Sequence, residues 1–228
     1  MTGAVAHLPS LRTVGLTVVA MLAFAANSIL CRLALANGSI DPASFTLVRI
    51  ASGAMTLWLI LALSGRARTV GGSWRAGFAL FAYAAAFSFA YITLSAGTGA
   101  LLLFGAVQAT MVTTGLVRGE RLARLQWLGF VAALGGLAAL LAPGVSAPPP
   151  VGASLMLAAG VAWGAYSLFG RGAADPLAAT GGNFLRALPM AAALLAAAAF
   201  AGLKGDAMGI VYAVLSGAVA SGLGYSIW

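Results

Sequence analysis

The sequence predicts an all-α membrane protein, a polytopic helical bundle of about eight transmembrane helices with an inverted 5+5 repeat whose last two helices are missing. Only 7% of the 228 residues are Asp, Glu, Lys or Arg, whereas 62% are apolar and the mean hydropathy is +1.02. Soluble domains usually carry about a quarter charged residues. This composition excludes a soluble enzyme and a disordered chain. Long apolar windows and an internal recurrence of short patterns give the rest of the prediction.

Eight windows are long and apolar enough to cross a bilayer, which takes about 20 mainly apolar residues. They are Val14–Leu35, Ala43–Leu63, Gly77–Leu94, Gly99–Leu116, Leu125–Leu141, Gly152–Phe169, Gly182–Ala201 and Met208–Trp228. None shows the alternation of barrel strands, so we expect helices. Asp41 and Asp175 each precede a proline, a pattern typical of an N-cap followed by the first helical residue.

Basic residues favour one side of the predicted bundle. If the N-terminus is cytoplasmic, that side receives nine arginines and the other side three basic residues. The nine are Arg12, Arg66, Arg68, Arg75, Arg118, Arg121, Arg124, Arg171 and Arg186, and the three are Arg32, Arg49 and Lys204. This bias predicts a multi-pass protein of the cell inner (plasma) membrane with a cytoplasmic N-terminus. It also accounts for the net charge of +8, so we expect the lipid bilayer as partner and no nucleic acid.

Three short patterns recur in the same order along the chain. Residues 24–32 resemble residues 163–171, Asp41-Pro42 recurs as Asp175-Pro176, and residues 90–94 resemble residues 224–228. The first copy holds an odd number of helices, so the second copy enters the membrane from the opposite face. The sequence therefore predicts a first repeat at 14–144 and a second, inverted and incomplete repeat at 152–228. Inverted repeats are associated with transporters whose binding site lies between the halves.

The order of these residues resembles the drug/metabolite transporter superfamily, specifically its ten-helix EamA-type permeases. The matching features are Asn27 to Arg32, Pro42, Arg49, the run Gly119 to Leu122, Gln126, Gly129, Gly135, Gly136, Trp163, Tyr166, Ser167, Arg171 and the segment Tyr225 to Trp228. The resemblance implies a permease that moves small organic metabolites by alternating access, with export as the expected direction. It also implies that a ninth and a tenth helix are absent, which leaves a nonfunctional truncated fragment as the alternative.

Enzyme signatures are almost absent from the sequence. The single histidine, His7, lies in the N-terminal tail, so a Ser–His nucleophile or a multi-histidine metal site has no parts. We expect no catalytic residue, no metal and no cofactor, and a membrane-embedded enzyme is the least favoured alternative. The four carboxylates, Asp41, Glu120, Asp175 and Asp206, fall at predicted helix ends. We expect helix capping by Asp41 and Asp175 and a surface ion pair between Glu120 and its neighbouring arginines.

Two arginines lie within predicted helices. Arg49 is seven residues beyond Pro42, about 10 Å along the helix axis. At that depth an arginine extends to the headgroups, pairs, or faces a water-filled cavity. Arg49 and Arg186 are therefore candidate gating or anion-contacting residues, with a purely structural role as the alternative.

Polar and aromatic side chains within the helices are the candidate substrate contacts. They are Asn27, Ser28, Ser88, Tyr91, Gln108, Trp163, Tyr166, Ser167, Ser221 and Tyr225. Amides, hydroxyls and aromatic faces suit an amphipathic small-molecule substrate such as an amino acid. Hydrogen bonding between helices without substrate contact remains the alternative. The sequence leaves a homodimer open.

Overall fold

The computed structural model describes residues 11–66, 70–142, 144 and 147–227. His7, Arg68 and Trp228, used above, lie outside these ranges. The described elements are α1 (Leu11–Ala36), α2 (Pro42–Leu63), α3 (Trp74–Ala90), α4 (Ala96–Val117), α5 (Arg124–Leu141), α6 (Pro150–Gly170), α7 (Pro176–Ala199), α8 (Ala207–Leu215), the π-helix η1 (Ser216–Leu223) and α9 (Gly224–Ile227). The protein is an all-helical bundle.

Aspartate caps start three of these helices, as the dipeptide patterns predict for two of them. Asp41 accepts hydrogen bonds from the amides of Ala43 and Ser44, and Asp175 accepts one from Ala178. Each cap satisfies amides that have no partner within the helix, and proline follows at the first helical position. The capping prediction for Asp41 and Asp175 is confirmed. Asp206 caps α8 in the same way.

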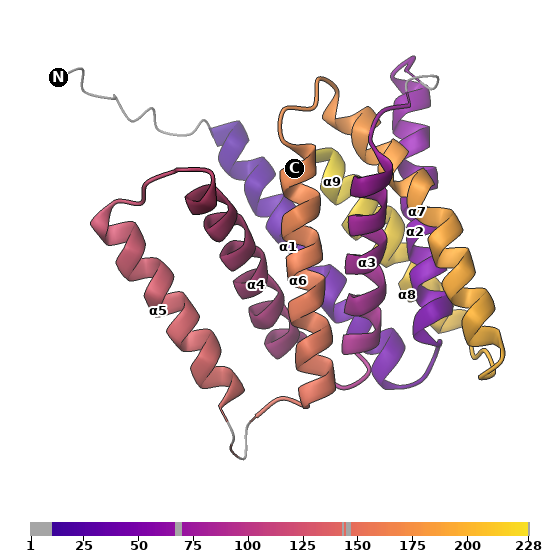
Figure 1. Cartoon of the computed structure of the whole chain (residues 1–228). Coiled ribbons are helices and arrows are strands. Elements are labelled where there is room, and N and C mark those ends of the chain that lie inside the picture. Colours follow the sequence, from indigo (N-terminus) through magenta and orange to yellow (C-terminus); the bar gives the residue numbers. More distant parts are fainter. Residues whose placement is uncertain (1–10, 67–69, 143, 145–146, 228) are drawn as a thin grey trace.

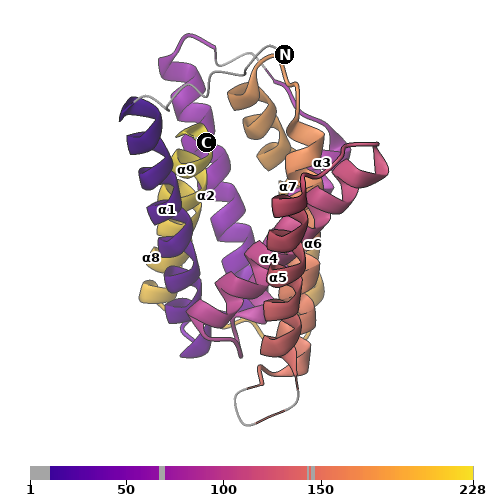
Figure 2. The ribbon, with the colours of Figure 1, turned by 90° about the vertical axis from the view of Figure 1, so that its left-hand side faces the viewer.

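The helices run alternately up and down, so every second connector lies at the same end (Figure 1). We call the end at which α1 begins the proximal end and the opposite end the distal end. Both views show α1 descending from the proximal end and α6 ascending towards it (Figures 1 and 2). The α6–α7 connector therefore lies at the proximal end, and the α1–α2 connector lies at the distal end.

Helix contacts divide the bundle into two similar sets. α3 packs along α6 and α7, whereas α8 with η1 packs along α1 and α2, and α2 packs along α7. Exchanging α1 with α6, α2 with α7 and α3 with α8–η1 reproduces this pattern. α5 packs mainly on α4 at the periphery, and none of its residues is buried.

Close packing depends on small residues, and two of them, Gly160 and Gly164, lie four residues apart on α6, a spacing that lets helix backbones approach. A Cβ atom on Gly160 would lie 2.6 Å from the carbonyl oxygen of Leu103, and one on Gly164 would lie 2.8 Å from Thr110 Cβ. These glycines let α6 approach the backbone of α4. Gly217 of η1 similarly lies directly against the backbone of Arg49 in α2.

Seven described helices are long and apolar enough to cross a membrane, as in a multi-pass membrane protein. Large apolar side chains point outwards from them, including Leu22, Met55, Leu128 and Val161. A water-soluble monomer rarely exposes such extensive apolar surface. The remaining predicted window forms α3, which has 17 residues and a length of about 26 Å.

Two of the predicted helices differ from the structure, one in its helix type and one in its first residue. The window Met208–Trp228 is not one α-helix, because the eight residues of η1 are π-helical. Gly217, Gly222 and Gly224 lie in or beside η1, and close contact with α2 occupies one face of it. α7 begins at Pro176, six residues before the predicted Gly182, because Asp175 and Pro176 supply a helix start that the apolar window does not register.

Candidate functional site

A network of buried polar side chains links four elements at the centre of the bundle. The hydroxyl of Tyr83 accepts a hydrogen bond from Arg49 Nη2 at 2.6 Å and one from Asn27 Nδ2 at 3.4 Å. Asn27 Oδ1 in turn accepts a hydrogen bond from the hydroxyl of Ser216 at 2.6 Å. These residues come from α2, α3, α1 and η1, and all four are at least nine-tenths buried. The network therefore fixes the relative positions of helices from both halves of the sequence.

Arg49 has no acidic partner in this network. Its side chain is 2% exposed, and its guanidinium carbon lies 5.0 Å from the ring centroids of both Tyr83 and Phe87. Arg49 Nη1 is buried without a hydrogen-bond partner among the described residues. Burying an unpaired ion costs several kcal/mol even after local relaxation. The two aromatic faces offset part of this cost through cation–π attraction.

Trp163 anchors an aromatic cluster beside the polar network. Its ring stacks on Tyr83 at a centroid distance of 5.4 Å, meets Phe24 edge-on at 5.3 Å and lies 5.6 Å from Phe104. These rings come from α6, α3, α1 and α4. A small central cavity of about 10 Å³ remains between them, lined by Phe24, Asn27, Ser28, Tyr83, Phe87, Leu103, Phe104 and Trp163. That volume is about what one water molecule requires.

A larger pocket, which we call the outer pocket, lies between α6, α7 and α9 towards the proximal end. It has a volume of about 270 Å³. Its lining residues are Trp163, Tyr166, Ser167, Gly170, Arg171, Ala173, Pro176, Ala179, Thr180, Asn183 and Tyr225. Trp163 also lines the central cavity, so this one residue borders both spaces. The outer pocket combines hydroxyls, an amide and aromatic rings, which can bind both polar and apolar parts of a small molecule.

Neither space is lined by a carboxylate, and the four acidic residues of the chain are all described. Asp41, Asp175 and Asp206 cap helices at the ends of the bundle. Glu120 lies in the α4–α5 connector against Gly115. Glu120 forms no salt bridge among the described residues, so its predicted ion pair is wrong. The salt bridge that is found there joins Arg66 to Asp175. The described residues also hold no group of three His, Cys, Asp or Glu side chains that could bind a metal ion.

Comparisons with known proteins identify one curated relative. No family model matches the chain. The "Uncharacterized protein PA1977" of Pseudomonas aeruginosa is 60% identical over 223 residues, which cover 97% of this chain and 77% of that protein. The chain belongs to the family of this Pseudomonas protein.

A solved structure described as "Crystal structure of protein" has the same fold. It aligns with a TM-score of 0.66 over 94% of this chain and 78% of that chain, at 20% sequence identity. At this identity the likeness concerns the fold alone. The name of the relative states no activity, so the site itself is the basis for a functional proposal.

The structure brings six predicted substrate contacts to the two spaces. Asn27 and Ser28 line the central cavity, whereas Tyr166, Ser167 and Tyr225 line the outer pocket. Trp163 lines both. Tyr166 and Tyr225 also pack edge-on, with ring centroids 6.1 Å apart. These residues come from α1, α6 and α9, and the recurring patterns relate α1 to α6.

Three other predicted contacts lie apart from both spaces and have local partners. The Ser88 hydroxyl donates to the carbonyl oxygen of Ala84 and accepts from Thr46. The Tyr91 hydroxyl donates to the carbonyl oxygen of Ala96, the first residue of α4. The Ser221 hydroxyl donates to the carbonyl oxygen of Ser216 within η1. In this conformation the Thr46–Ser88 bond joins α2 to α3, as the helix-to-helix alternative predicts, and the Tyr91 bond joins the end of α3 to the start of α4, whereas the Ser221 bond stays within η1.

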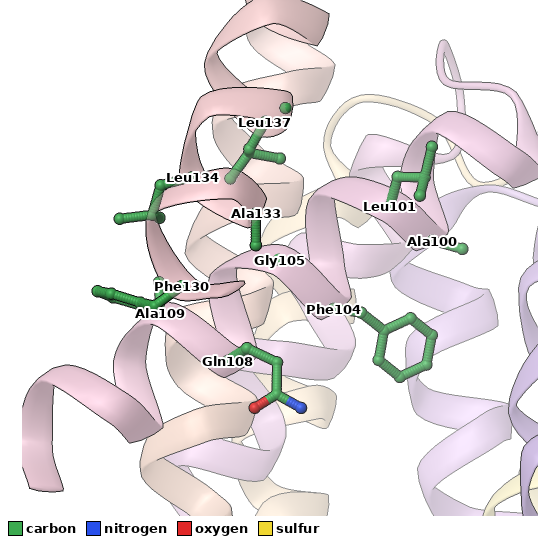
Figure 3. A pocket seen from close by; sticks show the side chains of 11 residues that line it. Ala100, Leu101, Phe104, Gly105, Gln108, Ala109, Phe130, Ala133, Leu134 and Leu137 are labelled. Atoms are coloured by element: carbon green, nitrogen blue, oxygen red, sulfur yellow. The ribbon is translucent and has the colours of Figure 1, made fainter. Parts of the chain in front are cut away.

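Gln108 also lies outside the site. It lines an apolar groove of about 550 Å³ between α4 and α5 (Figure 3), and it lines neither the central cavity nor the outer pocket. Phe104, one turn earlier on α4, lines both this groove and the central cavity. The sequence alone did not distinguish these positions, because the rotation of α4 about its axis depends on its packing against α6.

Arg186, the second predicted gating or anion-contacting residue, holds a loop. Its Nη1 donates to the carbonyl oxygens of Gly71 at 2.7 Å and Gly182 at 2.9 Å. Beside it, Asn183 Oδ1 accepts a hydrogen bond from the amide of Ser73. In this conformation Arg186 therefore fastens the α2–α3 connector to α7 and reaches neither space.

Sequence analysis missed Tyr83, Ser216 and Asn183. Tyr83 lies one turn before Phe87 in an apolar window, which is a weak signal that these two rings share a helix face. The recurring patterns did not reveal it, because the corresponding position of the second copy is Gly217. Asn183 lies seven residues after Pro176, the same separation as Arg49 from Pro42. That spacing could have identified it.

Proposed function

We propose that this protein is an integral membrane transporter that moves small organic metabolites by alternating access. The observation that carries the proposal is the relation of the two spaces. The outer pocket of about 270 Å³ ends at Trp163, and behind Trp163 lies a nearly filled central cavity with polar lining residues. A solute bound at the proximal end would reach the centre of the bundle once Trp163 moves away from its position between the two spaces.

The exchange of helix contacts supports this mechanism. α1, α2 and α3 run opposite to α6, α7 and α8 (Figures 1 and 2). The two sets also make corresponding contacts. Transporters built from inverted repeats open alternately to each face because either half can adopt the conformation of the other. In this proposal the two repeats span residues 14–144 and 152–228.

Charge at the helix ends supports an inner-membrane location with the proximal end in the cytoplasm. Among the described residues, the connectors and helix ends there carry Arg66, Arg75, Arg118, Arg121, Arg124 and Arg171. The distal end carries Arg32 and Lys204. Cytoplasmic loops are enriched in basic residues. The outer pocket would then face the cytoplasm, which fits export of a metabolite, as the EamA-type resemblance implies.

The test is uptake into proteoliposomes of a panel of labelled amino acids, with Trp163→Ala as the site variant. We expect uptake of at least one solute by the wild-type protein and a loss of about tenfold in Trp163→Ala, since its indole lines both spaces. Trp74→Ala is the matched control, because Trp74 is 62% exposed on α3. Trp163→Phe keeps an aromatic ring and guards against a folding defect. Equal uptake by Trp163→Ala and wild type would contradict the role of this site.

A further inference from the structure

Among the described residues, the buried positive charge of Arg49 has no counterion. Nη2 is bonded to the neutral hydroxyl of Tyr83, and Nη1 has no described partner. The rings of Tyr83 and Phe87 neutralise no charge. The four carboxylates all lie at helix ends or in a connector, and three of them cap helices. A fixed cation in a low-dielectric bundle attracts any anion that can reach it.

The two spaces that lead towards Arg49 are lined by a positive charge and by no negative charge, which suits an anion. Arg171 lines the outer pocket at the proximal end, and no acidic residue lines the outer pocket or the central cavity. Tyr83 lies between the cavity and Arg49, because its ring lines the cavity and its hydroxyl contacts the guanidinium. An anion that passes Trp163 would therefore meet Asn27 and Tyr83 first and Arg49 directly behind them.

We propose that the transported solute is a carboxylate and that Arg49 binds its carboxylate group in the central cavity. This inference rests on the proposed transport function and names its substrate class. A guanidinium and a carboxylate match as planar, two-point partners, and Nη1 supplies a donor that no described residue uses. Phe24, Phe104 and Trp163 surround the remainder of the cavity and suit an apolar or aromatic substituent.

The observed conformation is closed around this site. The cavity of about 10 Å³ does not admit a carboxylate-bearing molecule. Binding therefore requires the ring of Trp163 to separate from that of Tyr83. This stacking contact joins α6 to α3, one helix from each half, so a relative movement of the halves would open the cavity in front of Arg49.

The binding test uses benzoate and benzamide, which share size and ring but differ in charge. Binding of labelled benzoate and labelled benzamide to the purified detergent-solubilised protein is measured by equilibrium dialysis. We expect benzoate to bind at least about tenfold more tightly than benzamide, because only the carboxylate pairs with Arg49. Arg49→Gln abolishes this preference, and Arg49→Lys keeps part of it. Arg75→Gln, which removes an exposed arginine, leaves the preference unchanged.

The unfolding temperature of an Arg49 variant distinguishes a binding role of Arg49 from a purely structural one. If Arg49 only held the helices together, Arg49→Met would unfold more easily than the wild type. Removing an uncompensated buried charge instead leaves the unfolding temperature of the ligand-free protein unchanged or raises it. A marked drop in that temperature would count against the proposal.

The outcomes distinguish this inference from the transport proposal. Equal binding of benzoate and benzamide, no benzoate binding up to about 10 mM, or an unchanged preference in Arg49→Gln overturns the carboxylate site. If Arg49→Gln carries a labelled solute at the wild-type rate, transport stands and the role of Arg49 falls. Arg49-dependent benzoate binding without uptake of any solute supports the site and contradicts transport.

Discussion

Asp41 and Lys204 are joined by two hydrogen bonds across the distal end of the bundle. The amide of Asp41 donates to the carbonyl oxygen of Lys204 at 2.8 Å, and the amide of Lys204 donates to Asp41 Oδ2 at 3.2 Å. Ile40 and Gly205 form an antiparallel bridge beside them. At the proximal end, Arg66 Nη1 lies 2.9 Å from Asp175 Oδ2. At each end, therefore, an aspartate that caps a helix also joins the two halves of the sequence.

Replacing Asp41 tests the combined cap and connection. Asp41→Ala removes the acceptor for two α2 amides and for the Lys204 amide. Loss of an N-cap typically costs about 0.5–2 kcal/mol. We expect a decrease in the free energy of unfolding at the upper part of that range, measured by denaturant titration in detergent. Asp41→Asn retains an acceptor oxygen and should lose less; an equal loss would contradict the capping argument.

The same residue predicts a dependence of stability on pH. Burial alone would raise the pKa of Asp41, but hydrogen bonds from Ser44, Lys204 and Ala43 outweigh it and hold the pKa below the ordinary value of 3.8. Because the folded-state pKa is depressed, the stabilisation is complete above the unfolded pKa and is lost as pH falls through the folded one. Unfolding measured from pH 6 to about 2.5 should show this loss in the wild type. Asp41→Asn should show a smaller decrease over the same range.

The Arg66–Asp175 ion pair should contribute less to the free energy of unfolding than the cap that Asp175 forms on α7. Arg66 and Asp175 side chains are 44% and 28% exposed, and exposed pairs contribute about 0.2–1 kcal/mol. Arg66→Ala should therefore change the free energy of unfolding by less than about 1 kcal/mol, and added salt should reduce the difference. Asp175→Ala should cost more, because it also removes the acceptor for the Ala178 amide. A larger effect of Arg66→Ala than of Asp175→Ala would contradict this assignment.

Two glycine substitutions test the contact of η1 with α2. A Cβ atom on Gly217 would collide with the carbonyl group of Arg49 and with Ser52, so Gly217→Ala should destabilise the protein by about 1–3 kcal/mol. Gly135, on the peripheral α5, has open space around it. There the same substitution should stabilise by about 0.5–1 kcal/mol, since alanine favours helix more than glycine does. Thermal unfolding of the two variants gives the comparison. Similar destabilisation by both would contradict it.

Asn27 and Gln108 provide a matched pair for transport. Asn27→Leu removes the partner of Ser216 and Tyr83 at the centre, and we expect uptake to fall by about tenfold, or about 1.4 kcal/mol. Gln108→Leu alters only the α4–α5 groove and should leave uptake unchanged. The measurement is initial uptake of the same labelled solute in proteoliposomes. A loss in Gln108→Leu with normal Asn27→Leu uptake would move the site to the groove.

Local signals in the sequence predict most of the fold. Apolar windows locate the helices, and Asp41, Asp175 and the prolines after them mark two helix starts. Gly160 and Gly164 indicate a close helix contact, which the α4–α6 packing confirms. Each of these signals depends on a few neighbouring residues, so it can be recognised in the amino-acid sequence alone. The π-helical segment was missed because its composition is that of an ordinary apolar helix, and its contact with α2 is distant in sequence.

The candidate site was only partly predictable. Asn27, Ser28, Trp163, Tyr166, Ser167 and Tyr225 line the two spaces, whereas Gln108 and Arg186 do not. The central cavity between the two halves is nearly filled by aromatic rings. Residue types within an apolar window show that a polar group must find a partner, but they do not show whether that partner is a helix, a loop or a ligand.

The sequence by itself determined that this chain forms long apolar helices with capped starts and arginine-rich connectors, because hydropathy and capping depend on neighbouring residues. Only the tertiary structure decided which polar side chains meet. The rotation and contact of each helix place Tyr83 between Asn27 and Arg49, leave Arg49 without a counterion among the described residues and direct Gln108 outwards. These relations depend on side-chain packing between segments far apart in the chain.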